Sequence, residues 1–281
     1  MSKKLSKQKL NDIITYGIVI AAFVIMQILI NAGEISSLFQ GLMVPLCTYI
    51  ILAISLNLVV GILGELSLGH AGFMCVGAFT SSFFSKAMQD TITNSTVRFL
   101  LALLIGIITA AIFGIIIGIP VLRLNGDYLA IVTLAFGEII KNLVNVLFIG
   151  KDSKGFHFST KDAVSLNMEP DGKIILNGPQ GITGTPNDST FFIGFILILV
   201  TLFIVLNLIH SRDGRAIMAI RDNRIAAESI GINITKYKLM TFTISAAMAG
   251  AAGVLYAHNL SNLTANTNNF GYNMSINILV F

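Results

Sequence analysis

Two kinds of side chain are scarce in this sequence, and each shortage excludes a class of protein. The chain has two cysteines, Cys47 and Cys75, and both lie in apolar stretches without a second cysteine or a histidine at metal-binding spacing. Neither a disulfide framework nor a zinc site is therefore indicated, and both thiols are expected to be packing residues. Charged residues make up 11% of the 281 residues, against about 25% in typical soluble domains. The chain therefore has too little polar surface to cover a soluble globule of its length.

Apolar side chains, by contrast, are abundant and gathered in long runs. Hydrophobic residues make up 54% of the chain and the mean hydropathy is +0.82, which predicts an all-α, polytopic bundle of transmembrane helices. The net charge of +4 could suggest a nucleic-acid-binding protein. The basic residues, however, form short clusters beside the apolar runs, as the positive-inside rule describes, so nucleic acid is not an expected partner.

The apolar runs predict seven membrane spans within a single domain, 1–281. These spans are 13–30, 42–60, 71–85, 97–119, 128–149, 191–209 and 239–256. Four lysines in the first ten residues place the N-terminus in the cytoplasm, so that odd-numbered spans run outward. A signal peptide is the alternative, although the first run is longer than the apolar region of such a peptide. The last run, 274–281, is much shorter than the roughly 20 residues of a crossing helix, so the chain is expected to stop inside an unfinished span.

A polar and basic stretch, 211–238, lies between two long apolar runs and is expected to be a cytoplasmic arm. The span count places Arg123 on the same side. Within the arm, Asp222 or Asn223 is expected to cap a short helix, 224–230, which Gly231 ends in the left-handed conformation. One face of this helix is small and apolar, which suits either a groove on a partner protein or the anionic inner leaflet of the membrane. That face consists of Ala226, Ala227 and Ile230, with Arg224 and Glu228 on the polar side.

The span that follows the arm is rich in small residues. Ala246 with Gly250, and Ala249 with Gly253, form small-xxx-small pairs that let another helix approach closely. A force on the arm would therefore pass into a tightly packed bundle.

Four ionisable side chains lie within or beside the apolar runs. Glu65 and His70 belong to a glycine-rich stretch, 61–72, where the helix is expected to break as an inner turn or a partly re-entrant segment. They are then either solvated at the inner surface, which we favour, or functional groups at membrane depth. Glu138 and Lys141 lie three residues apart on one helical face. They belong either to a translocation pathway or to an internal ion pair without substrate contact.

The polar stretch 151–190 is expected to be a turn-rich external loop. Its end, NGPQGITGTP, does not predict a phosphate-binding loop, because no Gly-Lys-Ser/Thr follows it and no strand is expected before it. The chain has no Walker A sequence and no nucleophile beside a base, so it is not expected to be an enzyme.

Four separated segments are similar, in the same order, to segments of one family of membrane proteins. They are GELSLGHAGFMCVGAF, LRLNGDYLAIVTLAFGEIIK, NGPQGITG and GRAIMAIRDNRIAAESIGINITKYKLMTFTISAAMAGAAGVLYAH. They resemble the permeases of branched-chain amino-acid ABC importers of the LivM type, from about Pro45 to the C-terminus. The resemblance implies a multi-pass subunit of the bacterial cytoplasmic membrane that moves branched-chain amino acids by alternating access. It is less specific for the substrate, because urea and short-chain amide permeases are similar.

The resemblance also implies partners and coupling residues. The partners are a second related permease, two cytoplasmic ATPase subunits that bind ATP and Mg, an external solute-binding protein and membrane lipid; no cofactor is expected in this chain. Such importers share Glu-Ala-Ala, three residues and Gly in the loop that docks on the ATPase, and here Ile225 occupies the Glu position. The residues expected to couple to the ATPase are Gly214, Arg215, Arg221, Arg224, Ala226, Ala227, Glu228 and Gly231.

Two other functions are compatible with the residues. An ion-coupled secondary transporter would relay protons through Glu138 or His70, but it leaves the arm unexplained. A membrane scaffold that moves no solute is the second alternative.

Overall fold

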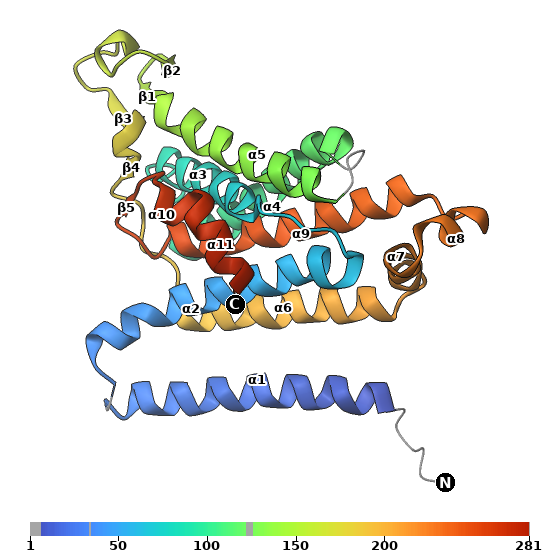
Figure 1. The fold of residues 1–281 in the computed structure, drawn as a ribbon. Coiled ribbons are helices and arrows are strands. Elements are labelled where there is room, and N and C mark those ends of the chain that lie inside the picture. The colour runs from blue at the N-terminus through green and yellow to red at the C-terminus, as the bar shows by residue number, and fades with distance from the viewer. Residues whose placement is uncertain (1–6, 34, 122–125, 281) are drawn as a thin grey trace.

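The computed structural model describes residues 7–33, 35–121 and 126–280, which form a bundle of helices with a small β-structure at one end (Figure 1). The expected all-α, polytopic architecture is confirmed. The longer helices are α1 (Lys7–Asn31), α2 (Ser37–Asn57), α3 (His70–Ala87), α4 (Ser95–Val121), α5 (Asp127–Val146), α6 (Phe191–His210) and α9 (Ile234–Ala257). The shorter ones are α7 (Arg212–Asp222), α8 (Arg224–Ser229), α10 (Thr267–Phe270) and α11 (Tyr272–Val280).

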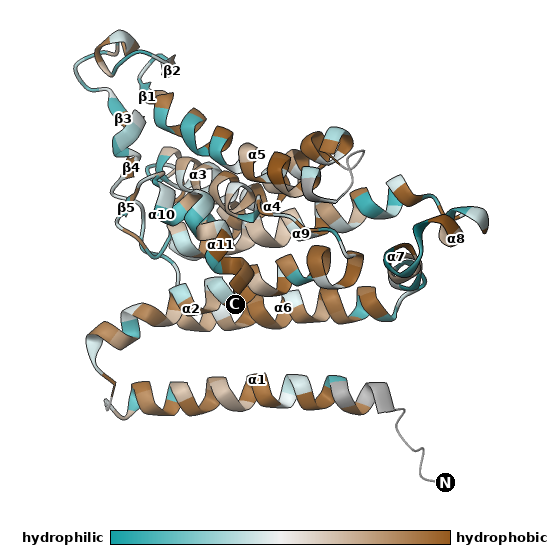
Figure 2. Cartoon of the chain, viewed as in Figure 1, coloured by the Kyte–Doolittle hydropathy of each residue, from teal (hydrophilic) through white to brown (hydrophobic). Residues whose placement is uncertain are grey.

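Six stretches of the described chain are long and apolar enough to cross a membrane, and Figure 2 shows most of their residues in brown. They are α1 from Asp12, α2 with the turn that continues it to Leu63, α4, α5 from Tyr128, α6 and α9. The third expected span, 71–85, is not among these six, although it does form a helix, α3. The reason is composition: many of the residues of α3 are glycine, serine or alanine, and His70 and Lys86 lie near its ends, so the helix is too polar to count as a span. Most of its residues are buried inside the bundle.

The chain turns back sharply after α2, as the glycines of 61–72 predict. A π-helical turn, Leu58–Leu63, ends at Gly64, whose φ of +79° is a left-handed conformation that favours glycine. Residues 65–69 are neither helix nor strand, and α3 begins at His70, whose Nε2 lies 2.8 Å from Ser245 Oγ. Because Ser245 is halfway along α9, α3 begins inside the bundle. The predicted break is therefore confirmed: an irregular segment precedes the helix α3, which starts within one residue of the expected position.

Helix α9 lies at the centre of the bundle and packs against α3, α4 and α2. Its small residues make these contacts possible. A side chain at Gly253 would place its Cβ 2.1 Å from the Met74 carbonyl oxygen of α3, and one at Gly250 would place it 2.4 Å from Ala110 Cβ of α4. Ala246 and Ala249 are fully buried. The predicted role of the small-xxx-small pairs in close helix packing is confirmed.

The segment expected as a turn-rich loop contains a sheet instead. Strands β1 (Phe148–Asp152), β2 (Gly155–Ser159) and β3 (Lys173–Asn177) are antiparallel in the order β2-β1-β3. Helix α5 ends at Val146 and β1 begins at Phe148. The predicted fifth span, 128–149, was therefore too long at its C-terminal end.

A second, two-stranded pairing ties this segment to the chain after α9. Strand β4 (Ile182–Thr183) pairs with β5 (Asn262–Leu263). The expectation that no strand precedes the run NGPQGITG was wrong, because β3 does. The run leads into β4 and not into a helix, so it still lacks the strand-loop-helix arrangement of a phosphate-binding loop.

The β1–β2 hairpin depends on one carboxylate. Asp152 accepts hydrogen bonds from the backbone N–H groups of Lys154 at 2.8 Å, Gly155 at 3.1 Å and Glu169 at 3.4 Å, and its Oδ2 lies 2.9 Å from His157 Nε2. Burial would raise the pKa of Asp152, but these hydrogen bonds together hold that pKa below its usual value.

A pH prediction follows from the lowered pKa of Asp152. The stability that its hydrogen bonds give is present above the unfolded pKa of about 3.9 and is lost as the pH falls through the lower, folded pKa. We therefore expect protection from hydrogen exchange in residues 148–160, relative to the intrinsic rate at each pH, to stay high from pH 7 to about pH 4 and to fall below it. Asp152→Asn should exchange fast already at pH 7, while Asp171→Asn, which changes an exposed carboxylate, should behave as wild type. Equal exchange in both variants would contradict this role of Asp152.

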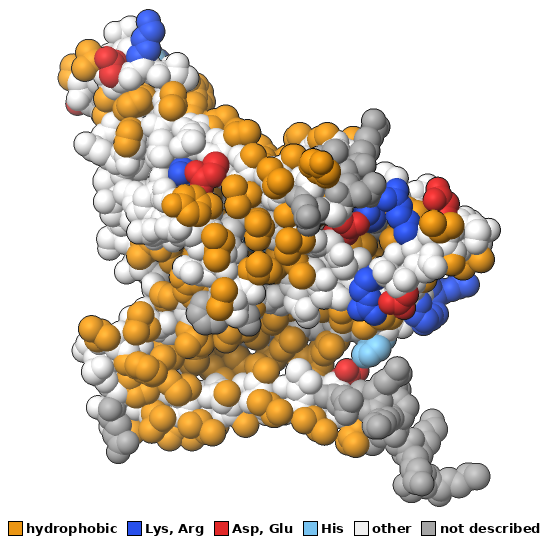
Figure 3. Space-filling model, viewed as in Figure 1, with side chains coloured by type: hydrophobic (Ala, Val, Ile, Leu, Met, Phe, Trp, Pro, Cys, Tyr) orange, Lys and Arg blue, Asp and Glu red, His pale blue; other side chains and the backbone are white. Residues whose placement is uncertain are grey.

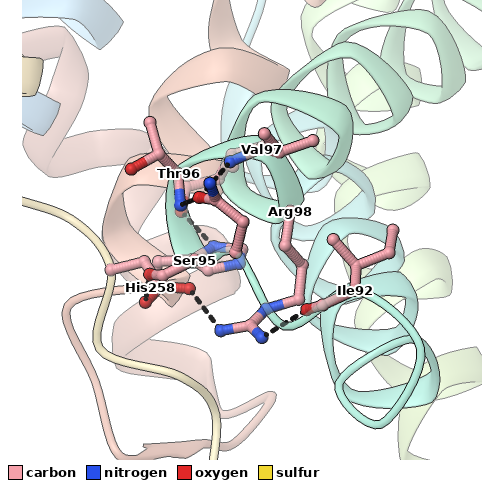
Figure 4. Close-up of polar contacts among 9 residues, drawn as sticks. Ile92, Ser95, Thr96, Val97, Arg98 and His258 are labelled. Carbon is pink, nitrogen blue, oxygen red and sulfur yellow. Dashed lines mark hydrogen bonds and ion pairs between the residues drawn. The ribbon is translucent and has the colours of Figure 1, made fainter.

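An ion pair at the end of the bundle that carries the β-structure joins the start of α4 to the chain before α6 (Figure 4). The Arg98 guanidinium donates to the Ile92 carbonyl oxygen at 3.1 Å and to Asp188 Oδ2 at 3.1 Å. Ser95 Oγ donates to the other oxygen of Asp188 at 2.5 Å. These bonds fasten the chain between β4 and α6 to α4.

Candidate functional site

The arm between α6 and α9 lies at the end of the bundle opposite the β-structure (Figure 1). The start of α1 lies at the same end, because Asp12 Oδ2 is 3.5 Å from His210 Nδ1. Lysine and arginine side chains gather over α7 and α8 in Figure 3. The sequence predicted that the N-terminal region and the arm share one side of the membrane, and the fold places them together. Arg123, predicted on that side as well, lies outside the described residues.

Helix α8 has the caps that the sequence predicts. Of the two candidates, Asn223 is the N-cap residue, and its Oδ1 accepts from the Ala226 N–H at 3.0 Å. At the other end, Gly231 has a φ of +86°, and the N–H of Ile232 donates to the Ala227 carbonyl oxygen at 3.1 Å. Both ends of this short helix are therefore fixed by its own sequence.

The outward face of α8 differs from the predicted one. Ala227 is only 2% exposed and packs with Ile220 of α7 and Ile234 of α9, so its assignment to the outer face was wrong. The other two residues of the predicted face, Ala226 and Ile230, are exposed, Ile230 at 75%. The most exposed apolar side chain is Ile225 at 81%, which the sequence did not place on that face, because helical spacing alone cannot tell which side of a short helix meets α7 and α9.

Helix α7 anchors the arm to the bundle. Ser211 Oγ caps it by accepting from the Gly214 N–H at 3.0 Å, and a Cβ on Gly214 would lie 2.1 Å from the Leu208 carbonyl oxygen, so α7 leaves α6 in a turn that only glycine fits. The Arg221 guanidinium donates to the Gly61 carbonyl oxygen of the π-helical turn at 3.0 Å. Arg215 donates to the His210 carbonyl oxygen at 3.3 Å. Arg221 and Arg215 thus make contacts within this chain.

Glu65 is not merely solvated. It forms an ion pair with Lys238 of α9, in which the Lys238 side chain is 3% exposed and that of Glu65 is 15% exposed. The interpretation of Glu65 as a solvent-facing residue of an inner turn was therefore wrong. The sequence placed Lys238 in the arm and missed this pairing. The available signal was a lysine directly before the predicted span 239–256, since such a charge needs a partner if the helix begins earlier and buries it.

His70 is also buried, at 1% exposure, where the sequence favoured solvent. Its Nε2 shares a hydrogen bond with Ser245 Oγ, which in turn donates to the Ser55 carbonyl oxygen at 2.5 Å. The imidazole thus joins the start of α3 to α9 and α2.

The charged pair on α5 lies where the sequence predicted. Lys141 Nζ is 2.5 Å from Glu138 Oε2, and their side chains are 10% and 25% exposed. Lys141 also donates to Thr267 Oγ1 at 3.3 Å, and Glu138 Oε1 accepts from the Tyr272 N–H at 2.7 Å. The two side chains thus form an ion pair, which by itself decides nothing between a structural role and a translocation pathway. The contacts with α10 and α11 were not predicted, because they join residues more than 120 positions apart.

Comparison with known proteins assigns these features to one family. The profile of the family described as the branched-chain amino acid transport system / permease component matches residues 37–281. The high-affinity branched-chain amino acid transport system permease proteins LivM of Salmonella typhimurium and Escherichia coli are each 37% identical over 218 residues, which cover 74% of this chain and 50% of the relative. A probable LivM of Methanocaldococcus jannaschii is 26% identical over 249 residues, which cover 78% of this chain and 66% of the relative.

The match has a limited extent. The chain spans about half the length of the bacterial LivM relatives that it matches. No solved structure matches the chain.

Proposed function

The chain belongs to the branched-chain amino acid transport permease family, and we propose that it is a membrane subunit of an ATP-driven importer of branched-chain amino acids. The observation that carries the proposal is the family match over residues 37–281 together with 37% identity to two LivM proteins. The multi-pass helical bundle is the architecture that such a subunit needs. The proposed partners are a second permease of the same family, two ATPase subunits that bind ATP and Mg, and an external solute-binding protein.

The arm supports the proposal as the contact with an ATPase. Helix α8 is a short, capped helix that presents two isoleucines to solvent on an otherwise polar arm, and exposed apolar side chains within a polar rim mark protein contacts. In this proposal the end of the bundle that carries the arm and the start of α1 faces the cytoplasm, and the end that carries the β-structure faces outward.

The contacts of the arm provide a route for movement into the bundle. Ala227 of α8 packs on Ile220 of α7 and on Ile234 at the start of α9, so a displacement of α8 acts directly on the central helix. Arg221 connects α7 to the carbonyl oxygen of Gly61, next to the reversal that leads into α3. We infer that the arm moves as a lever during alternating access, since it is joined to both helices that meet at His70.

A substitution on α8 tests the arm. Ile225→Asp should weaken ATPase binding about 30-fold, because an exposed apolar side chain at the centre of an interface commonly contributes 2 kcal/mol or more. The aspartate lies in the first turn of α8, where a negative charge is favourable, so the helix itself should persist. The measurement is ATPase retention by the purified complex in detergent.

Val164→Asp is the matched control, because Val164 is 84% exposed near the sheet at the opposite end of the bundle. It should retain ATPase as wild type does. Equal retention of ATPase by both variants would argue against docking through α8.

The substrate is tested by uptake. A strain that lacks its own branched-chain importer should recover ATP-dependent uptake of labelled leucine when this chain is produced with its proposed partners. Uptake of urea and not of leucine would show that the proposed substrate is wrong. Leucine uptake that follows the proton gradient without ATPase subunits would identify a secondary transporter.

A further inference from the structure

A polar seam runs along one face of α5 in the part of the bundle towards the β-structure. It consists of Glu138, Lys141 and Asn145 on α5, facing the stretch 265–272. Asn145 Nδ2 donates to the Ala265 carbonyl oxygen at 2.9 Å, and its Oδ1 is buried without a partner. Lys141 contacts Thr267 Oγ1, and Glu138 accepts the first N–H of α11, that of Tyr272.

The seam contains the charges that cost most to bury in a membrane. Among the described residues of the six candidate spans, Glu138 is the charged side chain farthest from a helix end, and Lys141 follows it within one turn of α5. Charged groups at such depth face protein or water, because exposure to lipid is unfavourable. Figure 3 nevertheless shows an acidic and basic patch at the surface over α5, and the Glu138 side chain is 25% exposed.

Exposed polar residues continue the seam towards the end of the bundle that carries the β-structure. Asn266 and Asn268 are exposed beside Thr267, and Tyr272 is 46% exposed. The hydrophilic colour of α10 and of the start of α11 in Figure 2 marks the same strip. A polar surface therefore leads from that end of the bundle to the Glu138–Lys141 pair.

Apart from the Glu138–Lys141 ion pair within α5, the bonds of the seam join α5 to a segment far away in the sequence. Separating the two would therefore leave the ion pair in place and open one hydrogen-bonding position on each of its charged groups. Glu138 would lose the Tyr272 N–H, and Lys141 would lose the Thr267 hydroxyl. A zwitterionic amino acid can replace both lost hydrogen bonds, because its ammonium group donates to the Glu138 carboxylate and its carboxylate accepts from the Lys141 ammonium group. A neutral amide carries neither charge.

We propose that this seam is the part of the translocation path nearer the β-structure, and that Glu138 binds the ammonium group and Lys141 the carboxylate of a zwitterionic amino acid. This inference rests on the proposed function and adds the residues and the chemical basis of substrate choice. In this structure the segment 265–272 makes the contacts with Glu138 and Lys141 that the substrate would replace.

The test is uptake of labelled leucine by the complete importer in proteoliposomes, at saturating loaded binding protein. The wild-type importer is measured first. If it took up urea in place of leucine in an ATP-driven reaction, the proposed substrate would be wrong, and this inference with it. Given wild-type leucine uptake, Glu138→Gln and Lys141→Gln should each lower the maximal rate about tenfold or more, as expected for loss of a charge-assisted hydrogen bond. Unchanged rates would overturn the inference alone.

Two further variants separate recognition from packing. The exchange variant Glu138→Lys with Lys141→Glu keeps an ion pair but reverses its polarity, so uptake should stay low; recovery would show a purely structural pair and overturn the inference. Thr109→Val on α4 is the matched control for loss of a polar group within a span, away from the seam, and should retain wild-type uptake.

A labelling experiment remains informative if the charge variants do not assemble. Asn268→Cys, on the exposed strip, should react with a membrane-impermeant thiol reagent, and reaction should lower leucine uptake at least tenfold. Cys47 and Cys75 are buried and should not react. Full labelling with unchanged uptake would overturn the assignment of the path.

Discussion

Gly253→Ala is expected to destabilise the folded protein by about 3 kcal/mol, at the upper end of the usual cost of overpacking. The new methyl group would lie 2.1 Å from the Met74 carbonyl oxygen and 3.0 Å from the Ala78 nitrogen. Both are backbone atoms of α3, so no side chain can rotate away and α9 must separate from α3. Close contact is the main attraction between helices in lipid, so the loss is not recovered elsewhere. The measurement is the unfolding free energy in mixed micelles titrated with denaturing detergent.

Gly17→Ala provides the matched control for this prediction. Gly17 lies in the middle of α1, and a Cβ there meets nothing within 4 Å. The same substitution should leave stability unchanged or raise it by up to about 1 kcal/mol, because alanine favours the helix over glycine. If the Gly253→Ala and Gly17→Ala variants were equally stable, the result would contradict the close contact between α9 and α3.

Lys238→Met is expected to cost about 3 to 5 kcal/mol, the usual loss when one partner of a buried ion pair is removed. The Lys238 side chain is 3% exposed and Glu65 is 15% exposed, so the carboxylate would stay largely buried without its partner. The pair also joins the segment that leads into α3 to the first part of α9. We therefore expect the thermal stability of the detergent-solubilised protein to fall and leucine uptake to fall with it.

Two controls define the origin of that loss. Lys236→Met removes an exposed lysine two residues earlier in the same helix and should change stability by less than about 0.5 kcal/mol. The double variant Glu65→Met with Lys238→Met removes both charges and should recover most of the stability, because an apolar pair of similar volume can replace a buried ion pair. A double variant no more stable than Lys238→Met would show that the pair does not account for the cost.

Features governed by neighbouring residues could be predicted from the sequence. Asn223 caps α8 and Gly231 ends it through contacts that span only a few positions, so the sequence pattern contains all the participants. The break at Gly64 and the ion pair between Glu138 and Lys141 are local in the same sense. The membrane spans depend on mean composition over about 20 residues.

Features that depend on how separate helices pack could not be predicted. Whether Ala227 or Ile225 faces solvent is decided by α7 and α9, which pack on one side of α8. The burial of His70 depends on Ser245, 175 positions away, and that of Glu65 on Lys238, 173 positions away. Hydropathy counted α3 as a span, but its start inside the bundle depends on these same contacts.

The sequence by itself determined that the chain is a membrane helix bundle, that its basic arm forms a capped helix, and that small residues line its central helix. It could do so because hydropathy, capping and helical spacing act over short stretches of chain. Only the tertiary structure decided which polar side chains pair inside the bundle, which face of α8 remains open and where the polar seam lies. The polar pairs follow from contacts between residues more than 100 positions apart, and the open face of α8 follows from its packing on the neighbouring helices α7 and α9; both geometries exist only once the helices have packed.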